Sequence, residues 1–180
     1  FPTRRSSDLP KDSRASAEWF LKAAEQGVAE AQSVLGYMYL IGDGAPQSNG
    51  KALDWMTKAA NQGDVMAQYN LGVMYGGKGV KAEPAKAAQW MRKAAEQGHK
   101  YALNSLASMY QEGNGVAKDP VLAHMLYGLS GKAGHVPALT SQKNLAAKMS
   151  SAQVKEANEL TKAWKKGAAL PIKSKSGAKK

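Results

Sequence analysis

Apolar residues recur along the chain with the spacing of an α-helix, in two kinds of segment that alternate. The first kind carries a stripe at positions i, i+4, i+7 and i+8: Ala31, Leu35, Met38 and Tyr39. The second kind carries a different stripe: Ala52, Trp55, Met56, Ala59 and Ala60. Because residues at these spacings share one face of a helix, the pattern predicts amphipathic helices arranged in pairs.

The helix pair is repeated along the chain. The glycine that closes the second helix of each pair returns after 36, 35 and 36 residues, at Gly27, Gly63, Gly98 and Gly134. Other positions keep the same phase: Trp19, Trp55 and Trp90; Ala31, Ala67 and Ala102; Leu35, Leu71 and Leu106; Tyr39, Tyr75 and Tyr110. One pair cannot bury both of its apolar stripes, so the repeat predicts pairs stacked on a shared core.

Local signals mark where these helices begin and end. A Gly-x-Gly loop follows the first helix of each pair, as at Gly42 and Gly44, and glycine readily adopts the left-handed conformation of a helix C-cap. Asp64 is expected to cap the helix that follows it. Pro84 and Pro120 suit a first helical turn, where the missing N–H group has no cost. These signals place helix boundaries in every copy of the repeat.

These residues together resemble a known family. The pattern Ala-x-x-x-Leu-Gly-x-Met-Tyr, Gly-x-Gly-Val, Ala-x-x-Trp-x-x-Lys-Ala-Ala-x-Gln-Gly is similar to the Sel1-like repeat, a relative of the tetratricopeptide repeat, over roughly residues 11–140. The resemblance implies an all-α, right-handed α/α solenoid of about three to four helix-pair repeats with a C-terminal capping helix. It also implies a non-catalytic scaffold or adaptor that binds a protein or peptide partner, and we expect a monomer.

Four segments are expected along the chain. Residues 1–9 look like the translation of a sequencing adapter, and the chain lacks a starting Met. We therefore expect the true N-terminus to be missing, so that the cellular compartment stays undetermined. Residues 11–149 would form the repeat array. Residues 150–166 would form a capping helix, opened by a capping box at Ser150 and Gln153 and ending near Trp164. Residues 167–180 would form a disordered basic tail.

Composition supports an all-helical chain and removes several chemistries. The sequence has 31 Ala against 15 β-branched residues, a ratio that favours helix over strand. It has no Cys, which excludes disulfides, thiolate metal sites and a cysteine nucleophile, and it has no apolar run long enough to span a membrane. Seven Lys and no acid lie in residues 162–180, so weak, non-specific binding of nucleic acid or anionic membrane is one alternative function.

The candidates for catalytic chemistry are weak. His99, His124 and His135 do not have the spacing of a metal site, and we expect no metal and no cofactor. Ser48-x-x-Lys51 matches the nucleophile motif of penicillin-interacting enzymes, but the companion Ser-Asp-Asn and Lys-Thr-Gly motifs are absent. A cell-wall or β-lactam-related enzyme therefore remains an alternative, and the preferred interpretation is a protein that is not an enzyme.

Most of the large apolar residues are interpreted as core. The tryptophans would fill the gap between the helices of their own repeat, as would six methionines at helical spacing: Met38, Met56, Met74, Met91, Met109 and Met125. Gly36 and Gly72 would let two helices approach closely.

A different set would face a concave groove, by analogy with tetratricopeptide-like solenoids. This predicted groove stripe runs along the first helix of each pair: Ser33, Val34, Tyr37 and Leu40; Tyr69, Asn70, Val73 and Gly76; Asn104, Ser105, Ser108 and Gln111. Its character changes from aromatic and apolar to polar along the array. We expect the polypeptide partner to bind in this groove or along the convex face, and the alternative is that the stripe is plain solvent-facing surface.

Overall fold

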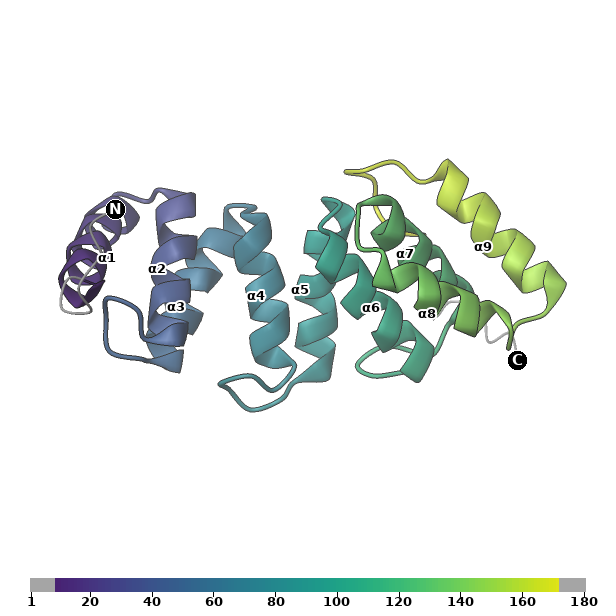
Figure 1. Ribbon diagram of the computed structural model, residues 1–180, viewed down its shortest axis with the longest axis horizontal. Coiled ribbons are helices and arrows are strands. Elements are labelled where there is room, and N and C mark those ends of the chain that lie inside the picture. The colour runs from purple at the N-terminus through teal and green to yellow at the C-terminus, as the bar shows by residue number, and fades with distance from the viewer. Residues whose placement is uncertain (1–8, 172–180) are drawn as a thin grey trace, which may run out of the picture. The chain divides into compact units, whose positions relative to one another are not determined.

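The computed structural model describes residues 9–171, with side chains from residue 13 onward, and the regular elements of this part are all helices (Figure 1). The helices are α1 (Leu9–Glu25), α2 (Ala29–Ile41), α3 (Asn49–Asn61), α4 (Val65–Tyr75), α5 (Pro84–Glu96), α6 (Lys100–Glu112), α7 (Pro120–Lys132), α8 (Pro137–Ala146) and α9 (Ser151–Ala163). None of them combines the length and hydrophobicity that a bilayer crossing requires.

The helices form two compact units, one ending at Glu83 and the other starting at Pro84. In the first unit, α1 packs on α2, α2 on α3 and α3 on α4, and α2 also touches α4. In the second unit, α5 packs on α6, α6 on α7, and α7 on both α8 and α9. Helices that are consecutive in the sequence therefore pack side by side within each unit, as the two alternating stripes predict, except that α9 packs on α7 rather than on α8.

Most of the residues on the predicted stripes are buried, although Tyr39 and Trp55 are only half-buried. Leu35, Met56, Leu71 and Met74 are the large, fully buried side chains of the first unit, and Leu103, Leu106, Met125 and Leu126 are those of the second. Met38 and Met91 are buried too, whereas Met109 is half-buried. The prediction that the methionines fill the core is thus confirmed for five of the six.

Gly36 brings α2 against α3. A Cβ atom at this position would lie 2.7 Å from Met56 Cγ, 3.1 Å from Met56 N and 3.2 Å from Ala52 O. Two of these three atoms belong to the backbone of α3 and cannot move independently of it. The close approach of two helices that the sequence predicts at Gly36 is therefore confirmed.

Replacing Gly36 by alanine is expected to destabilise the protein by about 1–3 kcal/mol, although alanine favours helix over glycine. The cause is the displacement of α3 that the added methyl group demands. Gly50, in the first turn of α3, has no atom within 4 Å of the position that a Cβ would take and serves as the matched control. Urea unfolding followed by circular dichroism should show Gly50→Ala as neutral or stabilising, and an equal response of both variants would contradict the packing argument.

The predicted caps are present. Asp64 Oδ1 accepts a hydrogen bond of 2.7 Å from the N–H of Ala67 at the start of α4. The capping box of α9 has both of its bonds, from the N–H of Ser150 to Gln153 Oε1 (2.9 Å) and from the N–H of Gln153 to Ser150 Oγ (3.2 Å). Pro84 and Pro120 are the first residues of α5 and α7. The capping helix ends at Ala163, one residue before the predicted end.

The chain after α9 is more ordered than the sequence predicts. Residues 167–171 were expected to belong to a disordered tail, but Leu170 is only 6% exposed and its N–H donates to Glu96 Oε1 over 3.1 Å. The N–H of Gly167 donates to the carbonyl of Glu96 over 2.8 Å. This stretch is therefore held at the C-terminal end of α5, while the remainder of the predicted tail, residues 172–180, lies outside the described residues, as do residues 1–8.

Candidate functional site

The predicted groove stripe of the first unit lies on α2 and α4, which touch each other. Tyr37 on α2 is 47% exposed and is the most open aromatic of the stripe. Tyr69 and Val73 on α4 are half-buried. Ser33 does not fit the prediction, because it is only 6% exposed and has no free surface for a partner. The stripe of this unit thus keeps one exposed aromatic residue, Tyr37, and one half-buried aromatic residue, Tyr69, on two helices that touch each other.

The α6 part of the stripe borders a hollow in the second unit. Asn104, Ser105, Ser108 and Gln111 are all half-buried. Gln111 lines a cavity of about 690 Å³ formed by the end of α6, the start of α7 and the face of α8. We call this cavity the α6–α8 hollow. Its wall includes Lys118 and Lys148, which the sequence did not single out.

A hydrogen-bonded cluster supports the wall of the α6–α8 hollow. Ser108 Oγ donates to Glu112 Oε1 over 3.0 Å, and Ser108 also hydrogen-bonds the hydroxyl of Tyr127. Burial raises the pKa of Tyr127, and the bond with Ser108 opposes that rise. Tyr127 is therefore a neutral residue of the wall, and Glu112 keeps its negative charge while it accepts the hydrogen bond of Ser108.

A second cavity continues from the first. It measures about 680 Å³ and lies between α8 and α9, where Val154, Lys155 and Lys162 line it. We call it the α8–α9 hollow. Met149 lines both hollows, so they adjoin each other at the end of α8.

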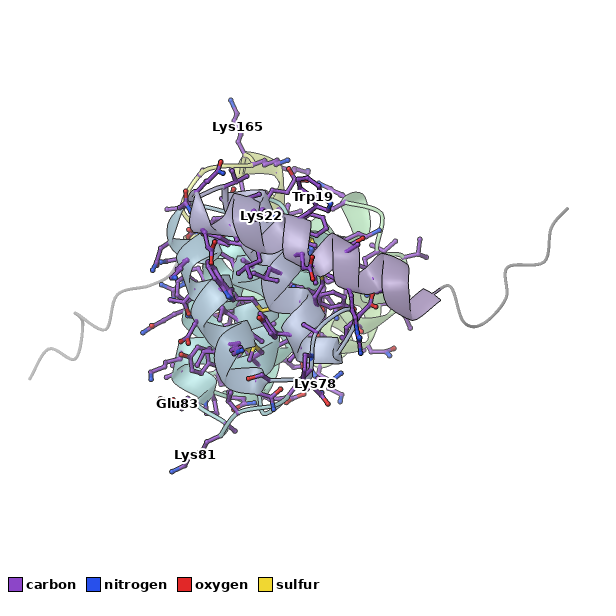
Figure 2. The ribbon with its side chains drawn as sticks, turned by 90° about the vertical axis from the view of Figure 1, so that its left-hand side faces the viewer. Trp19, Lys22, Lys78, Lys81, Glu83 and Lys165 are labelled. Atoms are coloured by element: carbon purple, nitrogen blue, oxygen red, sulfur yellow. The ribbon has the colours of Figure 1, made fainter. Side chains whose placement is uncertain are left out.

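The predicted packing role of the tryptophans is confirmed only in part: Trp55 packs against the buried cluster of Ala24, Ala31 and Leu35. Trp19 is 72% exposed, which contradicts its predicted role as core, and Trp55 and Trp90 are only half-buried. Figure 2 shows Trp19 and Lys22 on the outer side of α1.

Each tryptophan instead carries a lysine ammonium group over its ring. Lys22 Nζ lies 5.0 Å from the ring centre of Trp19, Lys58 lies 4.1 Å from Trp55, and Lys93 lies 4.2 Å from Trp90. Residues three apart on a helix are neighbours, and a cation above an indole face is attracted to it. The recurring Trp-x-x-Lys spacing was the signal for these pairs.

Two buried glutamines link successive helices and were missed in the sequence. Gln32 Nε2 donates to the carbonyl of Ala24 over 3.0 Å, and Gln68 Nε2 donates to the carbonyl of Ala60 over 3.2 Å. In each case, a glutamine side chain on the first helix of one repeat donates a hydrogen bond to a backbone carbonyl in the last turn of the preceding helix. That carbonyl has no partner within its own helix. The Ala-Gln pair that recurs after Gly27 and Gly63 was the signal that could have revealed this role.

The histidines have structural partners. His99 Nδ1 accepts the N–H of Ala102 over 3.2 Å and so caps α6. The side chain of Gln142 lies 3.5 Å from His124 Nδ1. His135 stacks edge-on with Tyr101, 5.2 Å between ring centres. Within residues 13–171, no group of three or more potential ligands could hold a metal ion.

Lowering the pH below about 6.5 is expected to destabilise the protein through His99 and His124. Burial lowers the pKa of both imidazoles, and Lys100 lowers that of His99 further. The unfolded chain then binds more protons than the folded one between the folded pKa values and 6.5, so the free energy of unfolding falls as pH falls through that window. Urea unfolding at pH 7.5 and 5.5 measures it. His99→Asn, which keeps a capping oxygen, should reduce the pH dependence, and an unchanged slope would contradict this assignment.

Ser48 is a helix cap in this structure. Its Oγ accepts the N–H of Lys51 over 3.4 Å at the start of α3. The ammonium group of Lys51 lies over the ring of Tyr39, 5.1 Å from its centre. The Ser-x-x-Lys spacing is therefore explained by capping and by a cation–π contact, and nothing in this arrangement activates the hydroxyl as a nucleophile.

Comparisons with known proteins identify the repeat. The Sel1 repeat model matches residues 5–28, 29–64, 65–99 and 100–135. The fold resembles that of a solved Sel1 repeat protein from Oxalobacter formigenes, with a TM-score of 0.69, 33% sequence identity, and coverage of 81% of this chain and 62% of that one. This likeness confirms the predicted α/α solenoid class.

A second solved structure is a protective antigen of uropathogenic Escherichia coli strains displaying an SLR fold. It has a TM-score of 0.48 and 31% identity over 81% of this chain and 39% of that one. The chain thus spans less than two thirds of either relative. Comparison with curated proteins gives no significant match. Since the repeat model matches most of its length, the chain belongs to the Sel1 repeat family.

Proposed function

We propose that the chain is a non-catalytic interaction scaffold that holds a polypeptide partner on the surface of its first-helix stripe. Sel1 repeats usually mediate interactions between proteins, and membership of this family supports the general role. The observation that carries the site is the exposed ring of Tyr37 on α2, next to a helix that bears the half-buried Tyr69. Aromatic side chains give a large contact area with few degrees of freedom to lose, and they dominate the energy of many protein interfaces.

A site-specific photo-crosslinker tests this proposal. Placed at Tyr37, it should form a covalent adduct with a polypeptide in cells that express the chain. The matched control places the same group at Trp19, which is more exposed but lies on the outer face of α1. We expect an adduct from Tyr37 and little or none from Trp19.

The double variant Tyr37→Ala with Tyr69→Ala should abolish the same complex. Losing two aromatic contacts at an interface centre costs about 2–4 kcal/mol, or more than tenfold in affinity. Glu30→Ala, on the exposed side of the first turn of α2, is the control substitution and should leave the complex intact. A complex that survives the double variant would place the partner elsewhere.

A further inference from the structure

The two adjoining hollows of the second unit combine an excess of lysines with apolar lining residues. The exposed lysines Lys118, Lys148, Lys155 and Lys162 line them, against two glutamates, Glu112 and Glu159. Within the described part of the chain, none of these four lysines is paired with a carboxylate of the protein. Their ammonium groups are therefore available to a ligand.

The lining residues carry a net charge of +2, from four lysines and two glutamates. Glu112 accepts a hydrogen bond from Ser108, which orients its carboxylate and leaves its negative charge in place. Glu159 lies on α9 between Lys155 and Lys162, one helical turn from each, so its charge is outweighed locally. A ligand that follows the hollows meets a surface with an excess of cations.

Apolar side chains also line the hollows. Leu145 and Met149 line the α6–α8 hollow, and Met149 and Val154 line the α8–α9 hollow. Gln111, Asn144 and Asn158 line the same hollows, and their amide groups can both donate and accept hydrogen bonds. Apolar contacts combined with polar groups are typical of interfaces between proteins.

We propose that this paired hollow binds an acidic polypeptide segment in which carboxylates alternate with apolar side chains. The inference deepens the proposed scaffold function and rests on it. The carboxylates would pair with the four lysines, and the apolar side chains would contact Leu145, Met149 and Val154.

The chain itself cannot supply this segment. In its sequence no two acidic residues stand two positions apart, as an alternating segment requires, and the closest pair, Glu156 and Glu159, is three apart. A second copy of the chain is therefore a poor occupant, and the partner is a different protein. Nucleic acid is disfavoured, because no Trp or Phe lines either hollow and the ring of Tyr127 is 4% exposed, so bases have no stacking platform.

Fluorescence anisotropy on the full chain tests the proposal with three labelled probes. The first is a short peptide of alternating Glu and Leu, the second replaces every Glu by Gln, and the third is a single-stranded oligonucleotide of equal charge. We expect saturable binding of the Glu peptide, weakened by added salt, and at least about tenfold weaker binding of the other two. Equal binding of the Gln peptide or of the oligonucleotide would overturn the proposal.

Charge reversal locates the site. Lys148→Glu with Lys155→Glu should weaken binding of the Glu peptide by about tenfold or more, since two attractions become repulsions. The matched control is Lys78→Glu with Lys81→Glu, which makes the same change of net charge on exposed lysines of the first unit, where Lys81 projects from the ribbon (Figure 2). Equal losses in both double variants would show general charge attraction and overturn the site.

The peptide-binding and crosslinking experiments together distinguish a failure of the acidic-segment site from a failure of the scaffold function. If the Glu peptide fails to bind while the crosslinker at Tyr37 still captures a polypeptide, the acidic-segment site is wrong and the scaffold function stands. If both experiments are negative, both proposals are wrong. Circular dichroism of each variant confirms that the helices are intact before binding is compared.

Discussion

Replacing Gly115 by alanine is expected to destabilise the second unit by about 2–5 kcal/mol, through two separate costs. The first is conformational, because Gly115 has φ of +71°, a left-handed conformation that L-residues adopt with strain. The second is steric, because a Cβ atom there would overlap the carbonyl group of Pro84 at the start of α5. Backbone atoms cannot rotate away, so the loop or the helix must shift. Urea unfolding followed by circular dichroism measures the loss.

Gly134→Ala separates the two costs. Gly134 has φ of +92°, but nothing lies within 4 Å of the position that its Cβ would take. We expect it to lose only the conformational part, about 1–2 kcal/mol. If Gly115→Ala were no more costly than Gly134→Ala, the contact with Pro84 would have no energetic importance.

Truncating Leu106 to alanine is expected to cost about 2–5 kcal/mol in free energy of unfolding. Its side chain is fully buried on α6, where α5 and α7 both pack against that helix. Removing three carbons there forfeits the transfer free energy of the side chain and leaves a cavity that packed helices close only in part. The variant should unfold at clearly lower urea concentration than the parent protein.

Leu139→Ala is the matched control for this truncation. The same chemical change is made on α8, where Leu139 is 44% exposed. We expect a loss below about 1 kcal/mol, since most of the removed surface is already in contact with water. Similar losses for the two leucines would mean that Leu106 is not part of a packed core.

The predictable part of the candidate site was the helix that carries it, and the unpredictable part was the exposure of its residues. Spacing alone placed Tyr37 and Ser33 on the same stripe, yet the first is open and the second is buried. Spacing equally grouped Trp19 with the core, although it lies on the surface. A helical period fixes which residues share a face, but how much of that face is covered depends on neighbouring helices that the period does not describe.

The lysine-lined hollows illustrate the same limit. Lys118 follows α6 and Lys162 lies on α9, more than forty positions along the chain. No local pattern connects them, and they line adjoining cavities because α8 and α9 both pack on α7.

By itself, the sequence determined that this chain forms repeated helix pairs, where their caps lie and which apolar residues share a helix face, because these are consequences of local spacing and backbone preference. The tertiary structure alone decided why the second glycine of each Gly-x-Gly loop is needed. A Cβ atom added at Gly44 would contact the backbone of Ser13, one at Gly79 the side chain of Asn49, and one at Gly115 the backbone of Pro84. Each of these partners lies at or near the start of an earlier helix. Such contacts join residues about 30 positions apart, and only the packing of the helices brings them within van der Waals distance.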